Sequence, residues 1–259
     1  MPQNHEPSLT QISPAAQRTI LLYSVLAGLC PLIPIPFLDS MVLGLISRRM
    51  IRVLLSIKGL SASKANIHRL SRERAGCSLG WLYSVFLAPV KKLIRTLVFV
   101  LAFKDCVDAA SRWLHRGYLV SVALERGHLD EEALSRTNGV WPVTLAIEES
   151  IMKIDTSPIN QLVWQAFTQS RSLLRTAARD LARRLRRVRG DGAAATEAVD
   201  AAAHAEEEVL SSIIEELSTG FWAMTGYLST LEALFIEHLP KTTARMLTKS
   251  DAEAGTHPP

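Results

Sequence analysis

A long apolar stretch near the amino terminus, interrupted by prolines, constrains the fold of this chain more than any other feature. Residues 20–46 read ILLYSVLAGLCPLIPIPFLDSMVLGLI and carry a single charge, that of Asp39. Three prolines divide the stretch: Pro31, Pro34 and Pro36. Proline disfavours helix at its own position and at the preceding residue. The sequence therefore predicts two apolar helices, from about Ala15 to Cys30 and from about Pro36 to Lys58, joined by a turn.

Each arm of this hairpin is short for a membrane span. The first apolar arm covers residues 20–30, whereas a spanning helix needs about 20 apolar residues. Three arrangements stay open: a hairpin buried in a helical core, a re-entrant or interfacial hairpin, and a single span over residues 20–38 whose prolines require neighbours for the freed carbonyl groups. For a hairpin docked on a membrane, the residues expected to contact lipid or shape the turn are Leu26, Pro34, Pro36, Phe37, Asp39 and Leu43.

The chain becomes basic directly after this stretch. Between residues 41 and 95 only Glu73 opposes a long series of lysines and arginines. Such residues beside apolar segments are typical of the cytoplasmic face of a membrane, and each contributes roughly 1 kcal/mol near an anionic leaflet. The candidates for contact with lipid headgroups are Arg48, Arg49, Arg52, Lys91, Lys92 and Arg95. The alternative is a solvated surface that happens to be basic.

The remainder of the chain indicates helices throughout. No segment alternates between apolar and polar residues with the period of a strand, and aromatic residues make up only 6% of the chain. The sequence predicts an all-α helical bundle. We expect a disordered tail over 1–14, a helical region over 15–157 that contains the hairpin and its basic flank, an antiparallel helical hairpin over 158–240, and a disordered tail over 241–259 after Pro240.

The expected hairpin over 158–240 has arms of opposite charge. Asp180 alone opposes the arginines of the first arm: Arg171, Arg175, Arg179, Arg183, Arg184, Arg186, Arg187 and Arg189. The second arm contains Glu197, Asp200, Glu206, Glu207, Glu208, Glu215 and Glu216. This pattern predicts ion pairs between the two arms. Lipid headgroups and nucleic acid are the alternative partners, and nucleic acid is disfavoured because no aromatic residues interleave the arginines.

Signals for catalysis are few. The chain contains no H-E-x-x-H, no paired-cysteine spacing, no glycine-rich phosphate loop and no G-x-S-x-G. Asp105, Asp108 and His115 share one face of a helix, as charged residues of amphipathic helices commonly do. Three unpaired cysteines fit a reducing compartment. We expect a protein that is not an enzyme and that needs no metal and no cofactor.

A resemblance covers residues 27–62. The matching positions are Pro34, Pro36, Phe37 and Asp39 in a Pro-x-Pro-hydrophobic-x-Asp turn, and Met50, Ile51 and Gly59 in the following helix and its end. With these residues the segment resembles a helical domain of unknown function that is attached to some bacterial GTPases. The nucleotide-binding part of that family is absent, because this chain has no P-loop. The resemblance implies membrane association and a regulatory, non-catalytic role.

Together these features predict a membrane-associated scaffold or regulatory protein. We expect it on the cytoplasmic side of a membrane, peripheral or re-entrant, with membrane lipids as its partner and no role in nucleic-acid binding. The alternative is a soluble, all-helical adaptor of the cytoplasm with the apolar hairpin buried in its core.

Overall fold

The computed structural model describes residues 9–33, 38–72, 94–187 and 192–254, and within them it is an all-α bundle without strands. The predicted fold class is confirmed. The helices are α1 (Pro14–Leu29), the 3-10 turn η1 (Cys30–Leu32), α2 (Leu38–Ile57), α3 (Lys64–Leu70), α5 (Ile94–Glu125), α6 (Glu131–Ser135), α7 (Trp141–Lys153), α8 (Ser157–Gln169), α9 (Arg171–Arg187), α10 (Gly192–Val209), α11 (Ser211–Ala223) and α12 (Thr225–Ala254).

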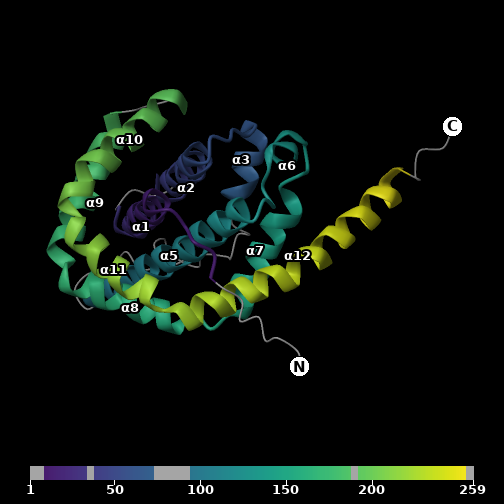
Figure 1. Cartoon of the computed structure of the whole chain (residues 1–259). Helices are drawn as coiled ribbons and strands as arrows, with labels where there is room; N and C mark the ends of the chain where they lie inside the picture. Colours follow the sequence, from purple (N-terminus) through teal and green to yellow (C-terminus); the bar gives the residue numbers. More distant parts are fainter. Residues whose placement is uncertain (1–8, 34–37, 73–93, 188–191, 255–259) are drawn as a thin grey trace.

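Helix α1 lies at the centre of the bundle (Figure 1). It packs against α5 and α2, and α9, α10 and α11 also contact it. Helices α9 and α10 form one outer edge of the molecule, whereas α3, α6 and α7 lie on the opposite side. Helix α12 packs along α7 and then continues beyond the bundle toward the carboxyl terminus. Helices from the expected region 158–240 therefore share one core with those from 15–157.

The first arm of the predicted apolar hairpin is a core helix. Every residue of α1 from Ile20 to Leu29 is buried. Among the described residues, Pro14–Leu32 is the one helical segment long and apolar enough to cross a membrane, and 67% of its apolar window is buried inside the protein. The central helix of a bundle has the same length and composition as a membrane span, so the hydropathy of α1 alone does not distinguish the two.

Two glycines allow α1 and α5 to approach closely. A Cβ atom on Gly28 of α1 would lie 2.9 Å from the Cβ of Ala110 in α5 and 2.9 Å from Cε2 of Phe167 in α8. A Cβ on Gly117 of α5 would lie 3.0 Å from Cγ2 of Ile20. Because Ile20 meets Gly117 while Gly28 meets Ala110, the two helices run antiparallel. The absence of side chains at these positions sets their separation.

Local chemistry determines several of the helix starts and ends. The Ser63 hydroxyl and the Asp130 carboxylate cap α3 and α6, each accepting a hydrogen bond from the backbone N–H three residues later, at 3.2 and 2.7 Å. Gly59 follows α2 and Gly127 follows α5, with φ angles of +69° and +73°. Glycine adopts this left-handed conformation without the strain that a Cβ atom causes.

The first arm of the expected hairpin over 158–240 is not one continuous helix. Helix α8 ends at Gln169 and α9 begins at Arg171, because Ser170 has a φ of −110° and a ψ of +24°, outside the helical region. Because of the break, the two helices pack against different neighbours. Helix α8 lies on α5 and α11, whereas α9 pairs with α10 at the outer edge.

The prediction that Pro240 ends the last helix is also wrong. Helix α12 includes Pro240 and reaches Ala254, so residues 241–254 are not the disordered tail that the sequence predicts. Proline in a helix interior costs about 3 kcal/mol, and a tertiary contact offsets part of this cost. The Thr242 side chain is buried and its hydroxyl bonds to the carbonyl of Pro142 in α7, at 3.0 Å.

The expected amino-terminal tail, residues 1–14, is partly ordered. The Ile12 side chain is buried, and the backbone N–H of Thr10 donates to the Glu232 carboxylate in α12, at 3.1 Å. The prediction of disorder is therefore wrong for residues 9–14, and residues 1–8 lie outside the described part of the chain.

The glycine contact between α1 and α5 can be tested by replacing glycine with alanine, once at the contact and once at a control position. Gly28→Ala should lower the free energy of unfolding by about 1–3 kcal/mol, because the new methyl group meets Ala110, Phe167 and a carbonyl of α5. Gly44→Ala is the matched control within α2, where the nearest atom is the end of Arg48, 4.0 Å away. It should raise the free energy of unfolding by up to about 1 kcal/mol. Urea unfolding measures both, and equal effects would contradict the close contact.

Candidate functional site

The predicted membrane-docking residues fall largely in the core or outside the described chain. Leu26 is 0% exposed, so it is a core residue and does not face the surroundings of the protein. Leu43 is half-buried at the edge of the core. Asp39 lies in the first turn of α2, as expected, but its side chain is outside the described part. Pro34, Pro36 and Phe37 also lie outside the described residues.

The predicted lipid-headgroup residues have different environments. Arg48, Arg49 and Arg52 are half-buried on α2, and Nε of Arg49 forms an ion pair with the Asp200 carboxylate of α10. Arg49 is thus engaged inside the protein and not presented to a headgroup. Lys91 and Lys92 lie outside the described residues, as does the side chain of Arg95.

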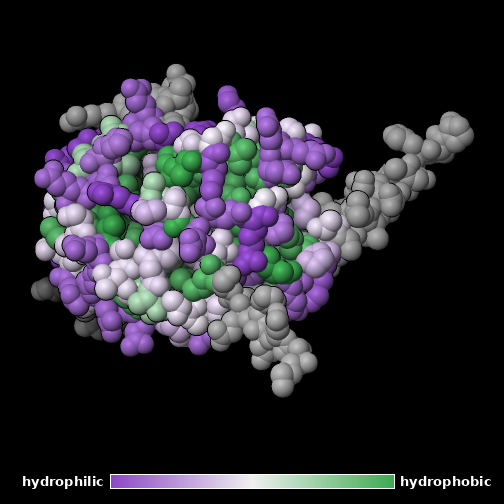
Figure 2. Space-filling model, viewed as in Figure 1, coloured by the Kyte–Doolittle hydropathy of each residue, from purple (hydrophilic) through white to green (hydrophobic). Residues whose placement is uncertain are grey.

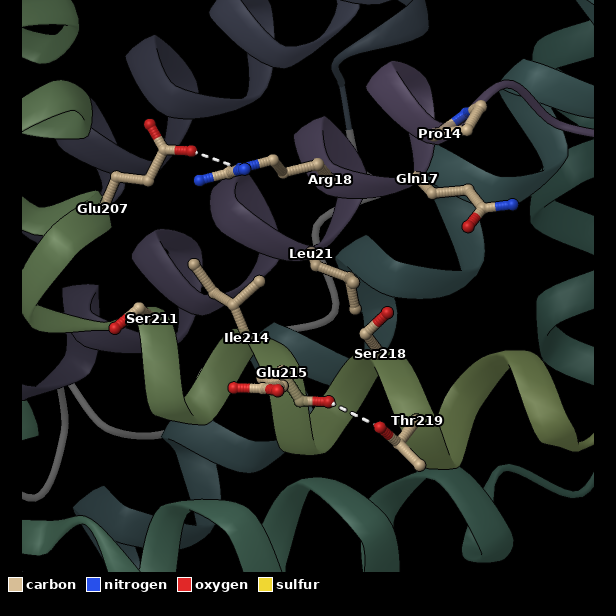
Figure 3. Close-up of a pocket in the computed structure, with 10 residues that line it drawn as sticks. All are labelled: Pro14, Gln17, Arg18, Leu21, Glu207, Ser211, Ile214, Glu215, Ser218 and Thr219. Carbon is tan, nitrogen blue, oxygen red and sulfur yellow. Dashed lines mark hydrogen bonds and ion pairs between the residues drawn. The ribbon is translucent and has the colours of Figure 1, made fainter.

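Acidic residues of α10 connect this helix to both arms of the apolar hairpin. Besides the pair between Asp200 and Arg49, the Glu207 carboxylate accepts from Nε of Arg18 in α1, at 2.5 Å (Figure 3). The sequence predicts that these acids pair with the arginines of α9. Within the described residues, burial and the neighbouring Asp180 raise the pKa of the Glu206 carboxyl, and the charge of Arg184 in α9 lowers it. Helix α10 therefore contacts both the hairpin and α9.

An open groove of about 380 Å³ lies beside the pair of Arg18 and Glu207. Side chains of α1 and α11 line it, among them Gln17, Ser218 and Thr219 (Figure 3). The guanidinium of Arg18 is already held by Glu207, and the Thr219 hydroxyl donates to the backbone carbonyl of Glu215, at 3.0 Å. The hydroxyls of Ser211 and Thr219 bond to backbone carbonyls of α10 and α11, and no group of three or more potential metal ligands occurs among the described residues.

The possible cluster of Asp105, Asp108 and His115 does not form a site. His115 is fully buried, whereas Asp105 is exposed and Asp108 half-exposed. Burial lowers the pKa of His115 to about 4, so the ring is neutral. Its Nδ1–H donates to the Ser111 carbonyl, at 2.6 Å, and Nε2 therefore accepts from the Tyr227 hydroxyl, at 2.5 Å. His115 joins α5 to α12 in a sealed interior.

A second buried network centres on Glu232, which is 4% exposed. Its carboxylate accepts hydrogen bonds from the Tyr118 hydroxyl, at 2.6 Å, and the Thr10 hydroxyl, at 2.8 Å, and pairs with Arg126, at 2.5 Å. Burial and the bond to Glu232 raise the pKa of the Tyr118 hydroxyl. Sequence reasoning missed this network. The one available signal is that Glu232 is an acid within an apolar stretch of α12, because a buried carboxylate requires partners.

The arginines of α9 whose side chains are described lie on its exposed side. Leu174, Ala177 and Leu181 face the core. Four exposed arginines follow one another at intervals of four residues along one flank, and we call them the arginine row: Arg171, Arg175, Arg179 and Arg183. Asp180 is the single acid within α9, and it pairs with Arg183, at 2.5 Å. Figure 2 shows that hydrophilic residues cover most of the edge that α9 and α10 form.

Comparisons of the chain with models of protein families, with curated proteins and with solved structures gave no match. The resemblance of residues 27–62 to the GTPase-attached domain stays an expectation from the sequence. Function is therefore inferred from the surfaces and buried networks of this chain itself.

The buried His115 predicts a specific dependence of stability on pH. In the unfolded chain it binds a proton near its ordinary pKa of 6.5, whereas in the folded protein it resists protonation until about pH 4. The contribution of the neutral His115 ring to the free energy of unfolding is fully present above pH 6.5. It is lost as the pH falls from 6.5 to about 4, and the loss is at most roughly 3 kcal/mol. Urea unfolding at a series of pH values should therefore show that, from pH 7 to pH 4, the free energy of unfolding falls less steeply for His115→Gln than for the wild type.

His68→Gln is the matched control for this measurement, because His68 lies exposed on α3. The free energy of unfolding of this variant should vary with pH as that of the wild type does. Burial also lowers the pKa of His128, and the charge of Arg126 lowers it further. Part of the pH dependence of stability should therefore persist in His115→Gln. The same pH dependence of the free energy of unfolding in the wild type and in His115→Gln would contradict a buried, neutral His115.

Proposed function

We propose that this protein is a non-catalytic scaffold or regulatory protein that associates with a membrane from one side, as a peripheral protein. The observation that carries the proposal is the sorting of charge in the bundle. Acids of α10 neutralise Arg18 and Arg49 of the hairpin, while the arginine row lies exposed on α9 with Asp180 as the one acid of that helix. Arginines exposed along one edge suit an anionic leaflet, to which each base near the surface contributes roughly 1 kcal/mol.

Contact through an outer surface fits the packing better than contact through the apolar hairpin. Residues Ile20 to Leu29 are buried against the rest of the bundle, and fully burying a large apolar side chain stabilises a fold by roughly 1.5–3 kcal/mol. Inserting α1 into a bilayer would require giving up these contacts. A peripheral mode leaves the core intact and uses side chains that already face solvent.

A scaffold or regulatory role is supported by the use that the fold makes of its buried polar groups. His115 bonds to Ser111 and Tyr227, and Glu232 bonds to Thr10, Tyr118 and Arg126. These contacts hold helices and the amino-terminal segment together. They do not present a reactive group to a substrate.

The burial of α1 also favours a second candidate, a soluble helical adaptor whose hairpin serves only as core. Both candidates share this core. They differ in whether the exposed arginines of α9 meet a membrane or a protein partner.

Membrane fractionation with three successive washes separates the possibilities. A peripheral protein held by charge should sediment with membranes at low salt and be released by high salt, because ions screen exposed charges over about 8 Å at physiological ionic strength. An inserted hairpin would resist both salt and carbonate and require detergent. A soluble adaptor would stay in the supernatant at every salt concentration, and that result would overturn the proposal.

A further inference from the structure

We propose that the corner where α8 meets α9 is the docking surface, and that it binds anionic phospholipid, with the arginine row on lipid phosphates and Trp164 at the interface between headgroups and acyl chains. This inference rests on the proposed function and names the surface and the lipid chemistry that the function would use. Three helices contribute to the corner: α5, α8 and α9.

Phe103 of α5 brings an exposed tryptophan and the first arginine of the row together. The Phe103 ring is buried, and the Trp164 ring meets it edge to face with centroids 4.9 Å apart. The Arg171 guanidinium lies 5.1 Å from the centre of the same Phe103 ring. Trp164 is nevertheless 38% exposed, in contrast to Trp113 of the core at 2%. The corner thus presents an aromatic ring and a cation side by side at the surface.

The arginine row extends this corner along α9. Arg175, Arg179 and Arg183 follow Arg171 at successive intervals of four residues, which corresponds to a row of about 18 Å at the rise of an α-helix. Guanidinium groups bind phosphate through two parallel hydrogen bonds, which a single ammonium cannot do. A row of this length matches a layer of repeated phosphates better than one small anion.

Two features favour a lipid surface over nucleic acid. Tryptophan is enriched at membrane interfaces, where the ring is partly in apolar surroundings and its N–H remains hydrated. Binding of single-stranded nucleic acid uses aromatic side chains interleaved with bases along the groove, and none occurs between Arg171 and Arg187.

The test uses the full-length protein and flotation with two kinds of vesicle, phosphatidylcholine alone and phosphatidylcholine mixed with phosphatidylglycerol. The wild type should float with the anionic vesicles and not with the neutral ones. Arg175→Gln with Arg179→Gln should weaken binding to the anionic vesicles by roughly 10- to 30-fold. Glutamine retains most of the side-chain length, and unchanged thermal unfolding would establish that the fold is intact. Arg179→Gln alone, with an intermediate loss, serves if the double variant does not fold.

The matched control is Lys64→Gln with Lys153→Gln, which removes two exposed bases from α3 and α7 on the side of the bundle opposite α9 (Figure 1). This variant should bind as the wild type does. If it loses binding to the same extent as the α9 variant, net charge and not the arginine row determines docking, and the inference is overturned.

Fluorescence quenching by lipids with brominated acyl chains tests Trp164 separately. Trp164→Phe keeps an aromatic ring against Phe103 but removes the indole from the corner. Quenching of the wild type should exceed that of Trp164→Phe. Equal quenching would mean that Trp164 does not reach the interface and would contradict its assigned place.

The outcomes separate this inference from the proposed function. If the wild type floats with anionic vesicles while the α9 variant floats equally well, membrane association stands and the docking surface lies elsewhere. If the wild type floats with no vesicle, including vesicles of a native lipid extract, the proposed function itself fails. Binding of an oligonucleotide in place of vesicles, with the same dependence on Arg175 and Arg179, would assign the row to nucleic acid and overturn the lipid assignment.

Discussion

The close antiparallel contact between α1 and α5 is the interaction on which the arrangement of the other helices depends. Gly28 and Gly117 let the two helices meet without intervening side chains, and Phe167 of α8 reaches the same point at Gly28. With α1 fixed at the centre, α2, α10 and α11 pack around its remaining surface. The apolar character of residues 20–29 is then explained by their burial in the protein.

Local features of the fold could be predicted from the sequence, because neighbouring residues determine them. The caps at Ser63 and Asp130 and the stops at Gly59 and Gly127 each depend on a few consecutive residues. Features that depend on distant contacts could not be predicted. Proline disfavours the interior of a helix, yet α12 continues through Pro240, and the bond from Thr242 to Pro142 lies a hundred positions away in sequence.

The same distinction between local features and distant contacts applies to the candidate surfaces. The opposite charges of α9 and α10 are visible in the sequence, but the partners of the acidic residues are not. Asp200 and Glu207 pair with Arg49 and Arg18, residues of the amino-terminal hairpin that nothing in the linear order connects to α10. Arg49, predicted from its position after an apolar segment to contact lipid headgroups, is instead held inside the protein. The Glu232 network was missed for the same reason, since its partners come from two distant parts of the chain, the amino-terminal segment and the end of α5.

This pairing has a consequence for the chemistry of the surface. Two acids of α10, Asp200 and Glu207, are engaged with the hairpin in the same contacts that close the bundle around α1. The exposed arginine row and the ion pair of Arg49 with Asp200 differ in their response to salt. The pair of Arg49 and Asp200 is about two-thirds shielded from solvent, with side chains 32% and 28% exposed, and partly buried pairs are screened much less than exposed ones. Salt should therefore weaken the proposed contacts of the arginine row with an anionic leaflet well before it separates Arg49 from Asp200.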